Sequence, residues 1–208
     1  MLPPTSSRTV TEPVVRLATA SDREAVVATV VAAFVADPAF RYFFPDDQTY
    51  AAEAGAFAAH LFDQRVRHGT VWVIDGVVAD GTPGGAVSMW NPPSAAPHPD
   101  LAPLAVPAAT SARIDAYEAA AHTALPTDPH WYLGVLATHP DHAGRRWGRA
   151  VMAAGLERAA ADALPAYLET TSASNVALYE RSGWSVAATV PVATIEIRVL
   201  RHGGTAQR

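Results

Sequence analysis

Apolar positions near the start of the chain recur at the spacing of a helix. The sequence Ser-Asp-Arg-Glu at residues 21–24 is a capping box, with Ser at the N-cap and Glu three residues later. The apolar row behind it consists of Val27, Val30, Val31 and Phe34. We therefore expect a helix from the box to about Asp37-Pro38, because the residue before a proline avoids helical backbone angles. A second helix is predicted from about Thr49 to Arg67, after an irregular aromatic segment at residues 40–45.

Shorter apolar runs, separated by Gly, Pro and Asp, predict strands. The expected strands are residues 14–17, 71–74, 85–90, 131–136, 167–171, 186–190 and 194–200. Further helices are predicted over residues 111–124, 147–163 and 175–182, the last closed by Gly183, a residue favoured after helix C-termini. In the helix at 147–163, we expect Met152, Leu156 and Ala160 to share one face.

The order of these elements predicts an α/β fold. Helices come first, then strands, and then an alternating β-loop-α-β-α-β series, which is typical of a mixed sheet with flanking helices. We expect one domain over residues 14–201. The ends, residues 1–13 and 202–208, are polar and rich in Gly, Pro, Ser and Thr, and are predicted to be flexible.

Composition narrows the classes of function. Half of the 208 residues are hydrophobic and the formal net charge is −5, which argues against a nucleic acid or a membrane surface as partner, because both require a basic face. The chain has no cysteine, so disulfides and thiol chemistry are excluded. Its start lacks a basic segment followed by an apolar stretch, and no apolar run approaches the roughly 20 residues of a membrane span. We expect a cytoplasmic protein.

The segment with the clearest chemistry is residues 136–150, LATHPDHAGRRWGRA. Here a strand leads through a glycine-containing turn into a helix, and the first amides of a helix have no internal partner and favour anions. A glycine before such an end lets the backbone approach a phosphate closely, and three arginines add positive charge. These features predict an anion site that suits a diphosphate. The alternative is an ordinary turn with surface arginines.

Two histidines in this segment raise the possibility of a metal site. His139 and His142 flank Pro140-Asp141, but no third ligand accompanies them at helical or strand spacing. Histidines in such a loop are usually solvated, so we expect no bound metal.

Residues 136–150 resemble the acetyl-CoA motif of the GNAT (GCN5-related N-acetyltransferase) superfamily. A second segment, NVALYERSGW at residues 175–184, resembles the helix that follows this motif about thirty residues later in the superfamily. The runs at residues 16–19, 33–38, 71–73 and 168–170 resemble puromycin N-acetyltransferase-like proteins. The resemblance covers about residues 14–200 and implies a GNAT fold, whose central sheet is splayed at a β-bulge.

The resemblance also implies a binding site for acetyl-CoA. The backbone of Leu136, Ala137 and Thr138 would pair with the pantetheine arm, and Asn175 would lie near its thiol end. The amides expected to hold the pyrophosphate are those of Gly144, Arg145, Arg146, Gly148 and Arg149. This chain departs from the family pattern where Arg146 replaces a glycine, so if relatives need a positive φ there, we expect the loop of this chain to be shaped a little differently. A second register, with Arg145, Gly148 and Ala150 at the motif positions, also fits.

The implied catalytic residues are Tyr179 and Glu169. Tyr179 lies one helical turn after Asn175 and would protonate the departing thiolate, although its ring could simply pack under the last helix. Glu169 would deprotonate the incoming amine, or alternatively pair with an arginine. Trp131 and Tyr132 are candidates for both pocket wall and core. The same two readings apply to Phe40, Tyr42, Phe43, Phe44 and Trp90.

The predicted activity is direct transfer of an acetyl group from acetyl-CoA to the primary amine of a small, antibiotic-like or toxic molecule. Backbone amides near residues 136–138 would polarise the thioester carbonyl. The alternatives are a protein or peptide N-acetyltransferase and a CoA-binding sensor without turnover. The presence of both Asn175 and Tyr179 argues against the sensor. Either a monomer or a homodimer is compatible with the sequence.

Overall fold

The computed structural model describes residues 13–93 and 100–203. Residues 1–12 and 204–208, which fall in the predicted flexible ends, lie outside the described residues. The expected flexible C-terminal end began at residue 202, and this boundary is wrong because His202 is the last residue of the final strand and pairs with Trp184 and Ala166.

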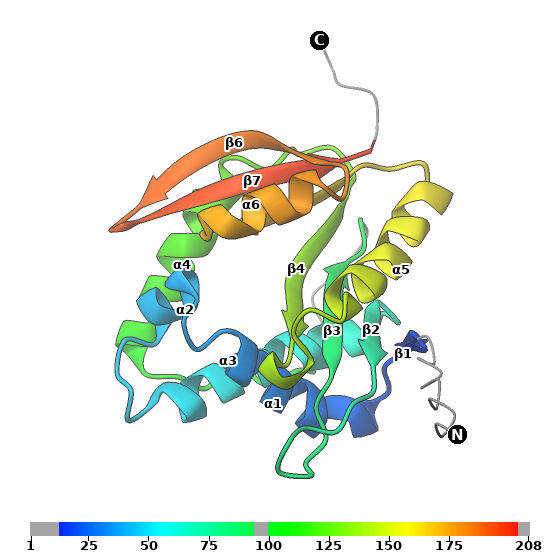
Figure 1. Cartoon of the computed structure of the whole chain (residues 1–208). Helices are drawn as coiled ribbons and strands as arrows, with labels where there is room; N and C mark the ends of the chain where they lie inside the picture. Colours follow the sequence, from blue (N-terminus) through cyan, green and yellow to red (C-terminus); the bar gives the residue numbers. More distant parts are fainter. Residues whose placement is uncertain (1–12, 94–99, 204–208) are drawn as a thin grey trace, which may run out of the picture.

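The fold is α/β, with one seven-stranded mixed sheet in the order β1-β2-β3-β4-β5-β7-β6. The strands are β1 (Arg16–Leu17), β2 (Val71–Ile74), β3 (Ala86–Asn91), β4 (Trp131–Thr138), β5 (Ala166–Thr170), β6 (Trp184–Val192) and β7 (Ile195–His202). Among the strands of the described residues, β4 and β5 pair in parallel and all other neighbours are antiparallel. In Figure 1, β4 runs between β3 and the hairpin of β6 and β7, at the centre of the molecule.

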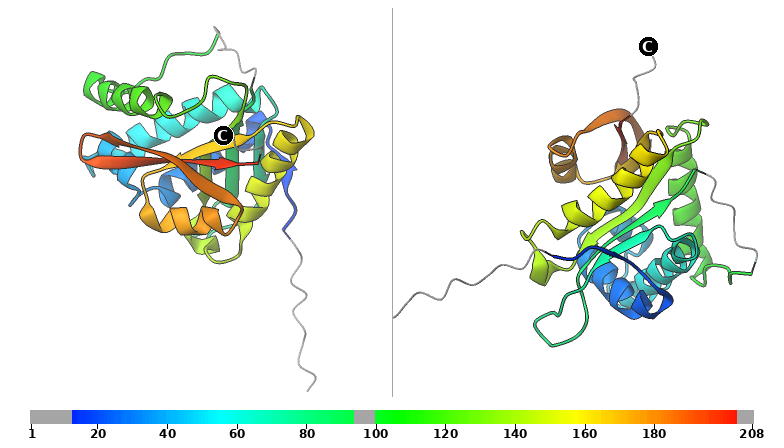
Figure 2. Two further views of the ribbon diagram at one scale, coloured as in Figure 1. Left: turned by 90° about the horizontal axis from the view of Figure 1, so that it is seen from above. Right: turned by 90° about the vertical axis from the view of Figure 1, so that its right-hand side faces the viewer.

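Helices cover both faces of this sheet. They are α1 (Arg23–Ala33), α2 (Pro38–Phe43), α3 (Tyr50–Val66), α4 (Ala108–His122), α5 (Trp147–Ala161) and α6 (Ala173–Glu180), with 3-10 turns η1 (Ala20–Asp22) and η2 (Pro140–His142). The pair α1 and α3 packs on one face of β2 to β4, and α5 packs on the opposite face (Figures 1 and 2). Helices α2 and α4 pack together and contact the β6–β7 hairpin. No helix of the described chain is both long and apolar enough to span a membrane.

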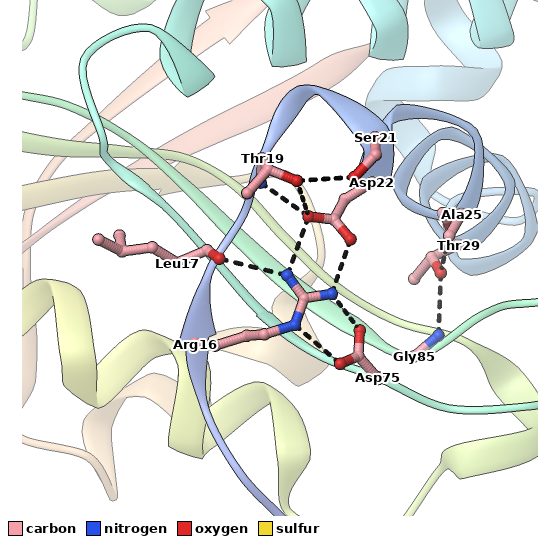
Figure 3. A network of polar contacts seen from close by, with 9 residues as sticks. All are labelled: Arg16, Leu17, Thr19, Ser21, Asp22, Ala25, Thr29, Asp75 and Gly85. Atoms are coloured by element: carbon pink, nitrogen blue, oxygen red, sulfur yellow. Dashed lines mark hydrogen bonds and ion pairs between the residues drawn. The ribbon is translucent and has the colours of Figure 1, made fainter.

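The first helix begins differently from the prediction. The capping box is formed by Thr19 and Asp22, not by Ser21 and Glu24, and the Asp22 carboxylate accepts from the Thr19 amide at 2.7 Å. Asp22 is held there by Arg16, whose guanidinium donates to Asp22 at 2.6 Å and to Asp75 at 2.8 Å through Nε (Figure 3). Arg16 lowers the pKa of Asp22 to about 2. The ion pair with Arg16 therefore determines which residues form the capping box.

The aromatic segment expected to be irregular is the helix α2. Asp37 is its N-cap, and the Asp37 carboxylate accepts from the amides of Ala39 and Phe40 at 2.9 and 3.1 Å. Pro38 occupies the first helical position, where its missing N–H costs nothing. The same Asp-Pro pair that ends one helix in the prediction thus starts another in the structure.

A β-bulge at Gly134 changes the face that β4 presents to each layer. Trp131 and Leu133 pack in the cluster under α5, whereas Val135 and Ala137 pack in the cluster under α1 and α3. Strict alternation would place these four odd-numbered residues on one face. The register with β3 confirms the extra residue, because Met89 pairs with Val135 while the next residue, Trp90, pairs with Leu133.

The face of α5 that meets the sheet is also shifted from the prediction. Met152 is buried, but Ala160 is exposed and Ala159 takes the buried position one residue earlier. Gly155 lies on this buried face, directly against the indole of the fully buried Trp90. A Cβ at Gly155 would lie 2.1 Å from Trp90 Cε2, so only glycine lets α5 approach the sheet at this point.

We predict that Gly155→Ala destabilises the fold, because the added methyl group overlaps a large buried ring. Overpacking of this kind typically costs about 1–3 kcal/mol, which exceeds the gain of about 1 kcal/mol in helix propensity. The matched control is Gly55→Ala in α3, where the nearest side-chain atom to the new Cβ is 3.8 Å away. Urea unfolding should show a loss for the first variant and a gain of about 0.5–1 kcal/mol for the second. Equal changes in both would contradict this packing.

Candidate active site

A cavity of about 730 Å³ lies on the face of the sheet that carries α2, α3 and α4. Residues 132–136 of β4 and 168–171 at the end of β5 form its floor, and α6 contributes Asn175 and Tyr179. Helices α2, α3 and α4 supply most of the remaining walls, together with connecting segments that include residues 127–130. The cavity therefore opens where β4 and β5 separate.

The separation leaves one edge of β4 without a neighbouring strand. The parallel ladder between β4 and β5 ends at the pair Leu133 and Leu168, although β4 continues to Thr138. The His139 amide donates to the Gly85 carbonyl, just before β3, so it points toward β3. Amides along a strand point alternately to its two sides. The amides of Leu136 and Thr138 therefore point into the gap. These are two of the three backbone positions predicted to bind the pantetheine arm.

The glycine-containing turn after β4 ends in a set of helix amides without internal partners. Arg146 is the N-cap of α5, and its carbonyl accepts the first helical hydrogen bond, from Ala150. The amides of Trp147, Gly148 and Arg149 precede this bond, so they are available to an anion. Two of these three residues, Gly148 and Arg149, are among the predicted pyrophosphate ligands.

The turn keeps the left-handed backbone despite the arginine in place of glycine. Gly144 has φ 77° and Arg146 has φ 62° with ψ 16°, in the region that glycine adopts most easily. The Arg145 amide donates to the His142 carbonyl at 3.4 Å, and the Arg145 guanidinium lies 5.3 Å from the centre of the Trp147 ring. Arg145 therefore offers its side chain, more than its amide, to a bound anion.

Tyr179 and Asn175 face the same cavity from α6. They are one helical turn apart, as predicted, and both belong to the cavity wall. The Tyr179 side chain is 8% exposed, and its ring packs against Trp184 with the ring centres 6.2 Å apart. Burial raises the pKa of Tyr179, so the hydroxyl keeps its proton at neutral pH.

Glu169 lies on β5 just beyond the last residue pair with β4. The hydroxyl of Tyr132 donates a hydrogen bond to its carboxylate. Burial raises the pKa of Glu169 to about 7, against the opposing effects of the Tyr132 hydrogen bond and the positive charge of Arg65. A carboxylate with this pKa exchanges protons near neutral pH. It is therefore suited to proton transfer.

The structure shows which of the aromatic candidates line the cavity and which lie in the core. Tyr132, Phe40 and Phe43 line the cavity. Trp131, Trp90 and Phe44 are buried in the core away from it, and Tyr42 packs beside Phe43 without reaching the cavity wall. The described residues contain no cluster of three groups able to hold a metal. The His139 ring lies beside that of His142, which packs on Trp147.

Sequence reasoning missed several polar residues of the cavity, among them Arg65, Glu118 and Thr171. Arg65 comes from α3, Glu118 from α4, and Thr171 from the end of β5, where its hydroxyl is buried and has no partner among the described residues. The position of Arg65 could have been predicted to be buried, because it continues the apolar row of Ala54, Ala58 and Phe62 at helical spacing. No sequence pattern indicates a role for Glu118 or Thr171, because only the tertiary fold brings them to the cavity.

Comparison with known proteins agrees with this arrangement. The sequence model described as "Acetyltransferase (GNAT) family" matches residues 31–184. A Corynebacterium glutamicum structure described as histone acetyltransferase HPA2 and related acetyltransferase superposes with a TM-score of 0.67 at 23% identity, covering 95% of this chain and 99% of that one. The polyamine N-acetyltransferase of Drosophila melanogaster superposes with a TM-score of 0.62 at 14% identity, covering 91% and 99%. An agmatine N-acetyltransferase mutant in its apo form gives 0.63 at 15% identity, covering 93% and 100%.

A mixed sheet splayed at a bulge, with a turn and a helix start at the open end, is the arrangement of acyl-CoA-dependent N-acyltransferases. The chain belongs to the acetyltransferase (GNAT) family. It is an N-acetyltransferase, and its family uses acetyl-CoA as cosubstrate.

Proposed function

We propose that this enzyme transfers the acetyl group of acetyl-CoA directly to the primary amine of a small molecule. The observation that carries the proposal is that one cavity collects the unpaired edge of β4, a carboxylate that titrates near pH 7 and a protonated tyrosine. The motif likeness to puromycin N-acetyltransferase-like proteins is part of this proposal and supports an antibiotic-like or toxic amine as acceptor.

The residues around the gap fit the cosubstrate. Acetyl-CoA supplies an activated acetyl group on a thioester, at the end of an arm that contains amides and carries a diphosphate. In our proposal the backbone of residues 136–138 holds the arm, and Asn175 lies near the thiol end. The turn and helix start hold the diphosphate through Gly144, Arg145, Arg146, Gly148 and Arg149. The left-handed turn and the three unpaired helix amides support this assignment.

Two residues move the protons in this scheme. Glu169 accepts one proton from the acceptor ammonium, which leaves a neutral amine able to attack the thioester carbonyl. Amides on the open edge of β4 stabilise the negative charge that develops on the carbonyl oxygen. Tyr179 donates its proton to the departing thiolate, and the second proton that the nitrogen loses as the amide forms restores the Tyr179 hydroxyl. An acyl-cysteine intermediate is excluded because the chain has no cysteine.

The shape and charge of the cavity favour a small cationic acceptor over a protein. The acceptor end is walled by three helices, and its acidic residues include Asp115, Glu118 and Glu169. Two structural neighbours are a polyamine N-acetyltransferase and an agmatine N-acetyltransferase. We retain a protein or peptide acetyltransferase, and a CoA sensor without turnover, as alternatives. A cytoplasmic location and a monomer or homodimer remain part of the proposal.

A panel of amines assayed with acetyl-CoA, following release of the CoA thiol, tests the acceptor class. We expect turnover with small primary amines and none with acetylatable peptides. Turnover with peptides alone would support the protein acetyltransferase. CoA binding without any turnover would support the sensor.

We predict that Gly148→Asp weakens CoA binding strongly, because its carboxylate would face the bound diphosphate at the start of α5. Gly148→Asn is the matched control, since Asn has the same size without the charge, and a Cβ in either variant lies 3.0 Å from Thr138 Oγ1. Calorimetry should show a dissociation constant at least about tenfold weaker for Asp than for Asn, which corresponds to about 1.4 kcal/mol. Equal affinities would place the diphosphate elsewhere.

We predict that Glu169→Gln removes the acidic limb of the pH profile of kcat/KM. In the native enzyme Glu169 accepts a proton only when ionised, so kcat/KM should rise as the pH passes about 7. The loss in the variant should be largest just above this pH and should shrink toward the pKa of the free amine. Glu157→Gln, an exposed position on α5, controls for the charge change. An unchanged limb in Glu169→Gln would remove Glu169 from the mechanism.

We predict that Tyr179→Phe lowers kcat by about 10²-fold, the low end for a positioned acid, because a CoA thiolate is a good leaving group. The ring remains, so CoA affinity and the melting temperature should barely change. Tyr167→Phe on β5 is the control, since Tyr167 is buried but lies outside the cavity wall. If Tyr179→Phe turns over at the native rate while chemistry limits the reaction, solvent supplies the proton.

A further inference from the structure

Arg65 is a buried cation in the wall of the cavity. It lies near the end of α3, its side chain is 5% exposed, and its Nη1 donates to the Leu61 carbonyl at 3.1 Å. Its Nε is buried and has no hydrogen-bond partner among the described residues. Burying a guanidinium with so few partners is costly, so a position of this kind requires a compensating role.

The guanidinium lies directly against the bulge in β4. A Cβ at Gly134 would be 2.8 Å from Arg65 Nη2 and 3.3 Å from Tyr132 Cε1. The same glycine therefore makes room for both the arginine and the tyrosine ring. The Tyr132 hydroxyl in turn donates to Glu169. Arg65, Tyr132 and Glu169 thus form one continuous group beneath the point where β4 and β5 separate.

We propose that Arg65 is a positioning residue, whose buried charge at the bulge keeps Glu169 in its proton-accepting form near neutral pH. This proposal rests on the assignment of Glu169 as the base. Arg65 is suited to the role because a guanidinium stays protonated even when buried. A lysine in its place could lose its proton, and a neutral residue would leave the carboxylate without a nearby positive charge.

The charges around Glu169 support this role. Ionisable groups facing it from the surrounding elements are Arg65 of α3, Tyr117, Glu118 and His122 of α4, Tyr132 of β4, and Tyr179 of α6. Burial favours the protonated acid, and Glu118 adds to this effect by repulsion between like charges. The positive charges of Arg65 and His122 oppose it, but His122 is exposed. The nearby His60 is not a permanent positive charge either, because burial and the charge of Arg65 lower its pKa. Arg65 is therefore the permanent positive charge in this group.

A different use of Arg65 would be to bind a carboxylate of the acceptor. The acidic side chains of Glu118 and Glu169 face the same guanidinium, and they would repel such a group. The arrangement therefore favours compensation of Glu169 over recognition of an anionic substrate. The two readings predict different results when Arg65 is replaced.

The test is a titration of Glu169 by NMR in protein carrying ¹³C-labelled glutamate carboxyl groups, with the Glu169 signal identified by its loss in Glu169→Gln. We expect Arg65→Gln to move the titration midpoint upward by about one pH unit, as for loss of a nearby opposite charge. The acidic limb of kcat/KM should move by the same amount, with native rates recovered at high pH. Arg67→Gln, an exposed arginine two residues later, should leave both unchanged.

Gly134→Ala provides a second variant that keeps every charge. Its methyl group displaces the guanidinium, so the Glu169 midpoint should again rise, and this variant decides the question if Arg65→Gln does not fold. An unchanged midpoint in the folded variants overturns the proposal. A higher KM for acceptors with a carboxylate, at an unchanged midpoint, would assign Arg65 to substrate binding instead. If Glu169→Gln leaves the acidic limb intact, the assignment of the base fails, whatever Arg65 does.

Discussion

The extra residue in β4, Gly134, is the constraint on which the rest of the structure depends. Before Gly134, β4 pairs with β5, and its side chains Trp131 and Leu133 pack under α5. After Gly134, Val135 and Ala137 pack under α1 and α3, and β4 separates from β5. A buried strand edge with unpaired amides would be unfavourable in a sheet built only for stability. Here that edge borders a cavity, so the bulge leaves backbone amides of β4 available to a ligand.

The cavity concentrates groups whose protonation is shifted by burial. Burial raises the pKa of a carboxylate to about 7, raises the pKa values of two tyrosines and lowers that of an arginine. Such shifts gather where proton transfer is needed. Burial raises the pKa of both Glu169 and Tyr179, yet the two groups are suited to opposite tasks. One accepts a proton at neutral pH, and the other keeps its proton until a stronger base appears.

Sequence patterns predicted the sheet and most helices, because apolar periodicity and Gly or Pro breaks report local structure directly. They failed at the Thr19–Asp22 cap, which a tertiary contact with Arg16 holds. They also failed at α2, where the local Asp37-Pro38 pair starts a helix as well as following one. The turn at residues 139–150 and the α6 helix carry motifs, so their place at the site was predictable. Arg65 and Glu118 lie on helices without motifs, and only packing brings them together.

The most direct test of this account is amide hydrogen exchange along β4, measured with and without CoA. The amides of Leu136 and Thr138 point into the gap, whereas Ala137 points to β3 and serves as the internal reference. We predict that CoA slows exchange at Leu136 and Thr138 much more than at Ala137, because the pantetheine arm pairs with this edge. If CoA binds but exchange at Leu136 and Thr138 is unchanged, the splayed edge of β4 is not the cosubstrate site.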